Sequence, residues 1–194
     1  KRICEDAAAA CEAAPDGHAI PLDGVDDAVE SVPFLETYAA QLRDLIKKGA
    51  NHPTAYDEPL TGMKIIVDAG NGSGGFFAKS VLEPLGADVS GSQFLDPDGK
   101  FPNHSPNPED AEAMDSAVAA TVKAKADLGV IFDTDVDRSA VIDGDGNPIN
   151  RNKLIALLAA IILDEHPGST VVTDSVTSDG LAEFIEGKGG KHVR

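Results

Sequence analysis

After residue 32, short continuous apolar runs alternate with longer segments whose apolar residues recur at helical spacing. The continuous runs predict buried strands, and the helical spacing predicts helices between them. The predicted strands cover residues 63–67, 128–132, 140–142 and 170–173, and another begins at 87–89. The predicted helices cover residues 33–48, 76–82, 107–126 and 153–163. This alternation favours an α/β fold of the three-layer αβα type, with a mixed, largely parallel sheet.

The first predicted helix starts at Pro33, because proline suits the first turn of a helix. Lys47 and Lys48 favour its C-terminal end through the helix dipole, and Gly49 is a typical cap. An apolar stripe predicts the buried face of this helix: Leu35, Tyr38, Leu42 and Leu45.

Two later helices and one turn are also marked by sequence signals. Asn107, followed by Pro108 and two acidic residues, predicts the cap of a helix that carries Val118 and Val122. The apolar run at 154–163 is about half the length that spans a bilayer, so it predicts a buried core helix. The segment DGDGN at 143–147 lies between apolar runs and predicts a hairpin turn.

An acidic segment follows the apolar run at 128–132. Asp133, Asp135 and Asp137 occupy every second position, and Arg138 comes next. Three carboxylates this close repel one another by roughly 1 kcal/mol or more per pair near a protein surface. Alternate residues of an extended segment point to one side, so a hard divalent cation with oxygen ligands can offset the repulsion.

The acidic segment is open to three other interpretations. Acidic residues also crowd at strand ends in any acidic protein. An EF-hand loop is excluded, because counting from Asp133 its glycine and glutamate positions hold Arg138 and Gly144. A haloacid-dehalogenase-like phosphatase would use Asp133 as nucleophile and Asp135 as acid. That alternative leaves Asp137 and Arg138 unexplained, and the motif follows two α/β units instead of opening the domain.

The net charge of −17 argues against nucleic acid or an anionic membrane as a partner. Cys4 and Cys11 are the only cysteines, and they lie in an Ala-rich stretch that predicts a helix. This pattern favours free thiols in a reducing compartment, and therefore an intracellular protein. The chain has no signal peptide and does not begin with Met, so we expect a piece of a larger protein.

Gly70, Gly72 and Gly75 match the spacing of a dinucleotide-binding turn between a strand and a helix. The acidic residue that should close the next strand is missing, since that region reads ADVSGSQF. The glycines therefore predict a tight structural turn without a bound dinucleotide. His104 lies in a Pro-rich loop at 101–109, where a solvated or hydrogen-bonding role is favoured over a catalytic one.

Several segments in order resemble the α-D-phosphohexomutase superfamily of phosphoglucomutases and phosphomannomutases. They read IIVDAGNGSGG, VLEPLGADV, DPDGKFPNHSPNPE, ADLGVIFDTDVDR and GNPINRNKLIALL, and the resemblance covers roughly residues 33–194. The stretches FDTDVDRSAV and VVTDSVTSDGL are most similar to a plant and algal branch. The resemblance implies the cytoplasm or the plastid stroma as the compartment.

Members of this superfamily have four domains around a cleft. The resemblance implies that residues 1–32 end the first domain and form a linker, 33–165 are the metal-binding second domain, and 166–194 begin the third. It implies that a phosphoserine of the first domain passes its phosphoryl group to a hexose phosphate. It also implies Asp133, Asp135 and Asp137 as Mg²⁺ ligands and places Arg138 beside the transferring phosphate.

The expected function is therefore that of a fragment of a Mg²⁺-dependent phosphosugar mutase, inactive by itself. The chain lacks the serine loop T-x-S-H-N-P and the sugar-reading G-E-x-S-G-H, and Thr134 stands where glycine is commonest. In the third-domain motif D-x-K-x-S, here at 174–178, Val176 replaces the lysine. This departure leaves a non-catalytic sugar-phosphate-binding paralogue as the alternative.

Overall fold

The computed structural model describes residues 5–6, 8–9, 12, 30 and 32–194. The chain divides into two units, Lys1–Leu35 and Glu36–Arg194, and the sheets belong to the second. Cys4 and Cys11, the predicted free thiols, lie outside the described residues, as does most of the predicted tail at 1–32.

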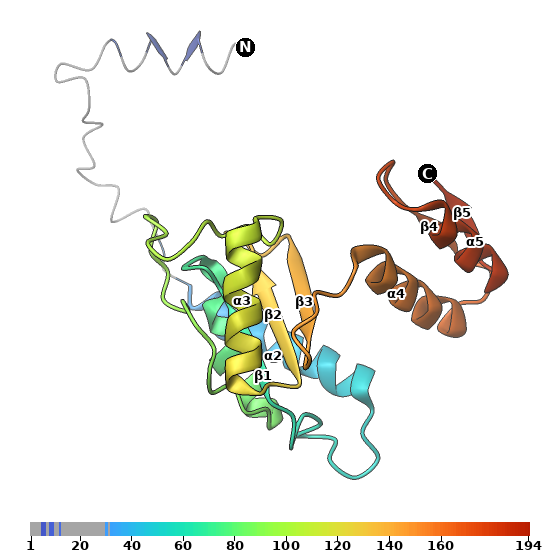
Figure 1. Cartoon of the computed structure of the whole chain (residues 1–194), viewed down its shortest axis with the longest axis horizontal. Helices are drawn as coiled ribbons and strands as arrows, with labels where there is room; N and C mark the ends of the chain where they lie inside the picture. The colour runs from blue at the N-terminus through green and yellow to red at the C-terminus, as the bar shows by residue number, and fades with distance from the viewer. Residues whose placement is uncertain (1–4, 7, 10–11, 13–29, 31) are drawn as a thin grey trace. The chain divides into compact units, whose positions relative to one another are not determined.

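The main sheet has three strands, β1 (Ile65–Asp68), β2 (Leu128–Phe132) and β3 (Ser139–Asp143), in the order β1-β2-β3 (Figure 1). β1 and β2 are parallel, whereas β2 and β3 are antiparallel. The turn after β3 returns the chain so that Pro148 bridges Ile142, which confirms the hairpin. A second sheet pairs β4 (Thr170–Val172) with β5 (Lys191–Val193) in parallel.

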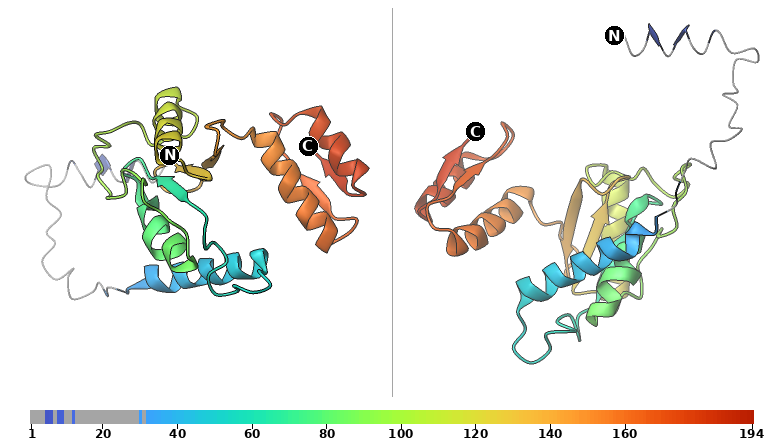
Figure 2. Two further views of the ribbon diagram at one scale, coloured as in Figure 1. Left: turned by 60° about the horizontal axis from the view of Figure 1, so that its bottom comes forward. Right: turned by 180° about the vertical axis from the view of Figure 1, so that it is seen from behind.

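Helices cover both faces of the main sheet (Figure 2). α3 (Ala111–Ala124) packs on one face, where Ala117 meets Ile131 and Ile142. The helical segment 73–85 covers the other face with Ala78 and Leu82. This segment combines short 3₁₀ turns (Ser73–Gly75, Glu83–Leu85) with a π-helical turn (Phe77–Leu82). The predicted α/β class with αβα layers and a mixed sheet is confirmed.

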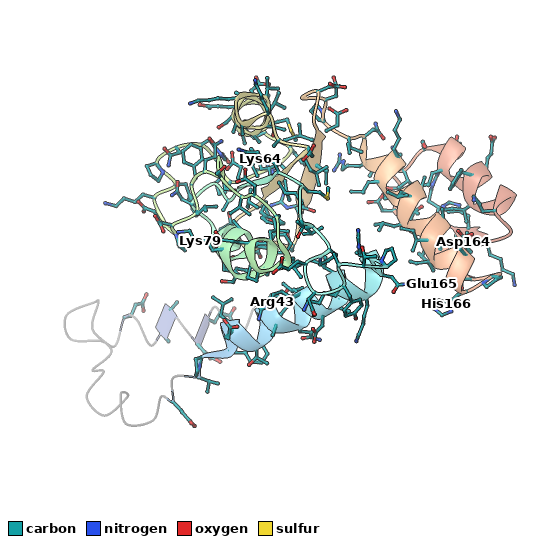
Figure 3. The ribbon with its side chains drawn as sticks, turned by 90° about the horizontal axis from the view of Figure 1, so that it is seen from below. Arg43, Lys64, Lys79, Asp164, Glu165 and His166 are labelled. Atoms are coloured by element: carbon teal, nitrogen blue, oxygen red, sulfur yellow. The ribbon has the colours of Figure 1, made fainter. Side chains whose placement is uncertain are left out.

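The buried face of α2 (Phe34–Ala50) shares only Leu42 with the predicted stripe. Ala39 is fully buried, and the half-buried Leu42 and Ile46 join it against Val81 and Leu85. The predicted stripe residues Leu35, Tyr38 and Leu45 are 43–57% exposed. Arg43, labelled in Figure 3, reaches from the helix to donate to the Ser80 carbonyl.

The ends of α2 and α3 also differ from the prediction. α2 continues through Gly49, and Asn51 adopts the left-handed conformation at its end, with φ 41°. Asp110, and not Asn107, caps α3 by accepting a hydrogen bond from the Glu112 amide. The buried face of α3 consists mainly of alanines, whereas Val122, which the sequence placed on this helix, is 50% exposed.

α4 (Arg151–Glu165) is not the buried core helix that its apolar sequence predicts. Only Ala159 and Leu163 are buried, against α5 (Asp179–Gly187). Four large apolar side chains of α4 are about half exposed: Leu157, Leu158, Ile161 and Ile162. No helix among the described residues is long and apolar enough to cross a membrane.

The strand predicted to begin at 87–89 is broken. Asp88 forms a parallel bridge with Lys64, just before β1, and Gln93 forms one with Asp68 of β1, and the chain bulges between them. Gly91 allows the bulge with φ 109°, and the Ser92 hydroxyl accepts the hydrogen bond of the Val67 amide in place of a backbone carbonyl. A side chain therefore replaces one rung of the ladder, which an apolar pattern does not reveal.

Asp88 anchors this bulge and provides a pH-dependent test of it. Hydrogen bonds from the hydroxyl and amide of Ser90, and then from Lys64, lower the pKa of Asp88 to about 2. Because the folded pKa is below the unfolded value, the ionised carboxyl stabilises the fold above pH ~4 and loses that effect as pH falls toward 2.

We expect Ser90→Ala to raise the pKa of Asp88 toward its ordinary value, because the substitution removes the hydroxyl donor. The measurement is an NMR titration of the Asp88 carboxyl carbon in both proteins. An Asp88 pKa that is the same in both would contradict the described bulge.

Candidate metal centre

The acidic loop begins where β2 ends. Phe132 is buried in the core, and the next residue, Asp133, is also buried, with 1% of its surface exposed. The Asp133 amide donates to the Arg138 carbonyl at 3.1 Å, and the Asp133 Oδ1 accepts from the Arg138 amide at 3.0 Å. These two hydrogen bonds close residues 133–138 into a short loop, which we call the metal loop.

The metal loop brings three carboxylates together. One oxygen from each of Asp133, Asp135 and Asp137 lies within 4.8 Å of the others. Asp133 supplies a buried ligand, while Asp135 and Asp137 are exposed. Between the last two, Val136 has φ 66°, which is unusual for a β-branched residue and turns the chain sharply. The three carboxylates predicted as ligands therefore share one location at the end of a sheet strand.

Arg138 is held at the edge of these carboxylates. Its Nε donates to Asp133 Oδ2 at 3.0 Å and lies 3.5 Å from Asp137 Oδ1. Its Nη1 donates to Asn107 Oδ1 at 3.3 Å. The side chain is 54% exposed, so the guanidinium remains accessible at the surface.

Mutual repulsion and hydrogen bonding shift the pKa values of this group. Burial raises the pKa of Asp133, but hydrogen bonds from Arg138 and Asp137 outweigh it and hold that pKa below its ordinary value. The hydrogen bond to Asp133, and then the charges of Asp135 and Asp133, raise the pKa of Asp137. A bound divalent cation would offset the repulsion among these carboxylates, because it favours the ionised form of each ligand.

The donor set fits Mg²⁺. All three predicted ligand atoms are carboxylate oxygens, which hard cations prefer. The group contains neither an imidazole nitrogen nor a thiolate sulfur, the ligands typical of zinc. With bonds of about 2.1 Å, opposite oxygens around Mg²⁺ lie roughly 4.2 Å apart. At most one pair of the three ligands can be opposite, and the three oxygens lie within 4.8 Å of one another, so they are grouped closely enough to be candidate ligands of one cation.

His104 is buried against the carboxyl end of β1. It is 6% exposed, and its Nε2 lies 3.0 Å from Asp68 Oδ1. Its Nδ1 lies 2.9 Å from the Ser105 carbonyl. The pair ties the loop at 101–109 to the end of β1, which agrees with the hydrogen-bonding role predicted for this histidine.

Asn107 is the residue near the site that the sequence pattern misassigned. Its Oδ1 accepts from the Glu109 amide at 3.1 Å as well as from Arg138. The same N-P-E-D sequence suits a helix cap, and the contact with Arg138 joins residues 31 positions apart. No local signal distinguishes these two roles.

A cavity of about 920 Å³ opens beside Arg138, in the size range of small-molecule sites. Asp137, Arg138 and Arg151 line it together with Asp174, the first residue of the motif at 174–178. Val176 of that motif is 78% exposed. The cavity thus combines acidic and basic side chains at the edge of the metal loop.

Known proteins provide the family context for this geometry. Residues 40–146 match the family described as phosphoglucomutase/phosphomannomutase, alpha/beta/alpha domain II. A phosphoglucomutase of Neisseria meningitidis is 36% identical over 151 residues, which are 78% of this chain and 33% of the relative. A phosphomannomutase/phosphoglucomutase of Pseudomonas aeruginosa is 35% identical over 165 residues, 85% of this chain and 33% of the relative.

A solved structure of a phosphoglucomutase/phosphomannomutase family protein from Burkholderia thailandensis is also similar. It superposes with a TM-score of 0.65 and 32% identity, covering 78% of this chain and 32% of that protein. The chain therefore spans about a third of the length of the relatives that it matches.

Proposed function

The chain belongs to the phosphoglucomutase/phosphomannomutase family, and on that premise we propose that it is the metal-binding part of a Mg²⁺-dependent phosphosugar mutase. In this proposal residues 33–165 are the second domain, residues 1–32 end the first, and 166–194 begin the third. The substrate of the full-length protein is a hexose phosphate, such as glucose 1-phosphate or mannose 1-phosphate. The chain alone is inactive.

The observation that carries the proposal is the meeting of Asp133, Asp135 and Asp137 at one point beside Arg138. Asp133, Asp135 and Asp137 would hold the Mg²⁺ ion, which supplies positive charge to neutralise phosphate oxygens when bound. Phosphoryl transfer depends mainly on such positioning and charge neutralisation.

Arg138 contributes a second, permanent positive charge in this proposal. Asp133 fixes its Nε, while the half-exposed guanidinium can bind a phosphate oxygen. The family assignment excludes the dehalogenase-like alternative, because the matched residues 40–146 include the whole metal loop. The plant and algal branch and the stromal compartment stay predictions.

The test is an assay of the full-length protein for conversion of glucose 1-phosphate to glucose 6-phosphate, with mannose phosphates in parallel. We expect turnover that EDTA abolishes and Mg²⁺ restores, and none from the 194-residue chain. Sugar-phosphate binding without turnover would instead support the non-catalytic paralogue, which the valine at position 176 favours.

A further inference from the structure

The glycine turn at residues 69–75 touches the metal loop directly. Ser73 donates two hydrogen bonds to the Thr134 carbonyl, one from its amide at 2.9 Å and one from its hydroxyl at 3.0 Å. Thr134 lies between two of the proposed ligands, Asp133 and Asp135. One carbonyl of the metal loop is thereby held by two donors that come from 61 residues earlier in the chain.

The glycines of this turn are needed because the metal loop lies against them. A Cβ on Gly72 would lie 2.8 Å from the Thr134 carbonyl oxygen and 3.0 Å from its Cα. Gly72 has an ordinary φ of −82°, so backbone conformation does not explain the glycine. A Cβ on Gly74 would lie 2.8 Å from the Phe132 ring and 3.2 Å from Val136 Cγ2.

Together these contacts involve the even-numbered residues of the metal loop and Phe132, the residue just before it. Phe132, Thr134 and Val136 lie against the glycine turn, while the odd-numbered aspartates converge on the candidate metal position. A shift of the metal loop away from the turn would therefore move all three carboxylates at once.

The glycine turn is itself fixed to the rest of the domain. The Asn71 amide donates to the Phe94 carbonyl at 2.8 Å, and the Asn71 carbonyl accepts from the Asp98 amide at 2.9 Å. A Cβ on Gly75 would lie 1.8 Å from the Leu95 carbonyl oxygen, so this end of the turn packs tightly on the chain at 93–95. The turn is thus suited to act as a rigid support.

We propose that the glycine turn positions the metal loop, with Ser73 as a positioning residue for the cation ligands and Gly72 as the contact that sets the separation. This role rests on the proposed Mg²⁺ site. In this proposal the three glycines with G-x-G-x-x-G spacing do not bind a dinucleotide. They form a turn against which the metal loop packs.

The test measures the affinity of the 194-residue chain for Mn²⁺, a paramagnetic substitute for Mg²⁺ that is detected by electron paramagnetic resonance. We expect Ser73→Ala and Gly72→Ala each to weaken binding by about tenfold or more, as loss of a residue that orients metal ligands does. Ser73→Thr keeps the hydroxyl and should restore binding. Gly99→Ala is the matched control, because a Cβ there meets nothing within 4 Å.

A second readout needs no metal. In the absence of Mn²⁺, hydrogen exchange of the Arg138 amide, which donates to Asp133, should be faster in Ser73→Ala than in the unchanged chain. Since Ser73 is exposed, this variant should keep its fold even if Gly72→Ala does not.

The outcomes separate the positioning role from the metal site. Unchanged Mn²⁺ affinity in Ser73→Ala, in a chain that binds Mn²⁺, would overturn the positioning role and leave the metal site intact. Absence of Mn²⁺ binding by the unchanged chain would overturn both.

Discussion

The Asp135→Asn substitution should lower the mutase rate of the full-length protein by about a hundredfold or more. Asp135 is an exposed member of the carboxylate group, and the substitution removes one ligand charge with almost no change in size. Loss of a preorganised electrostatic stabiliser typically has an effect of about this size on the rate. The assay follows glucose 1-phosphate conversion at saturating Mg²⁺.

Asp115→Asn is the matched control for charge. Asp115 is exposed on α3 and belongs neither to the carboxylate group nor to the cavity lining, so its substitution should leave the rate unchanged. The unfolding midpoint of Asp135→Asn without metal should stay the same or rise, because repulsion among the aspartates is reduced. Full mutase activity in Asp135→Asn would remove the metal loop from the mechanism.

Asp68→Ala should destabilise the 194-residue chain by about 3 kcal/mol or more, the summed cost of leaving several buried hydrogen-bond donors unsatisfied. Asp68 is 1% exposed, and its carboxylate accepts hydrogen bonds from three groups: the Gly70 amide, Gln93 Nε2 and His104 Nε2. Alanine would leave these buried donors without their acceptor. Urea unfolding followed by circular dichroism measures the loss.

Asp115→Ala serves as the control here, since an exposed aspartate should change the free energy of unfolding by no more than about 0.5 kcal/mol. A variant at position 68 that is as stable as the control would show that the Asp68–His104 pair does not hold the loop at 101–109 against β1. That result would also remove the structural role assigned to His104.

The strands of the main sheet could be predicted because their signal is local. Residues 65–67 and 128–132 are continuous apolar runs, and burial on both faces of the sheet requires such runs. The aspartates were predictable for the same reason, since all three follow one strand within five residues. Arg138 is part of the same short segment.

The errors arise where distant residues decide the outcome. α2 buries Ala39 instead of Tyr38 because the helical segment 73–85 approaches closely enough to need a small residue, and a stripe of large apolar residues gives no hint of this. The apolar residues of α4 predict burial, but only Ala159 and Leu163 among the described residues of this helix are buried, in a small cluster with residues of α5 and β4. The strand predicted near residue 88 does not form continuously, because the Ser92 side chain replaces a backbone carbonyl as the hydrogen-bond partner of Val67.

The supports of the site are hidden from the sequence for the same reason. Ser73 and Thr134 are 61 residues apart, and His104 and Asp68 are 36 apart. Their residue types are ordinary for loops, so nothing local marks them as partners. The sequence therefore identifies the residues that would bind the ion but not those that hold them in place.

The most direct test of the metal site is crystallographic. Crystals of the 194-residue chain soaked in MnCl₂ should give an anomalous difference peak bonded to carboxylate oxygens of Asp133, Asp135 and Asp137, at about 2.1 Å from each. Crystals of Asp135→Asn, treated in the same way, should show a weaker peak or none. A fully soaked crystal of the unchanged chain with no peak at this loop, or with the three carboxylates turned apart, would contradict the metal site.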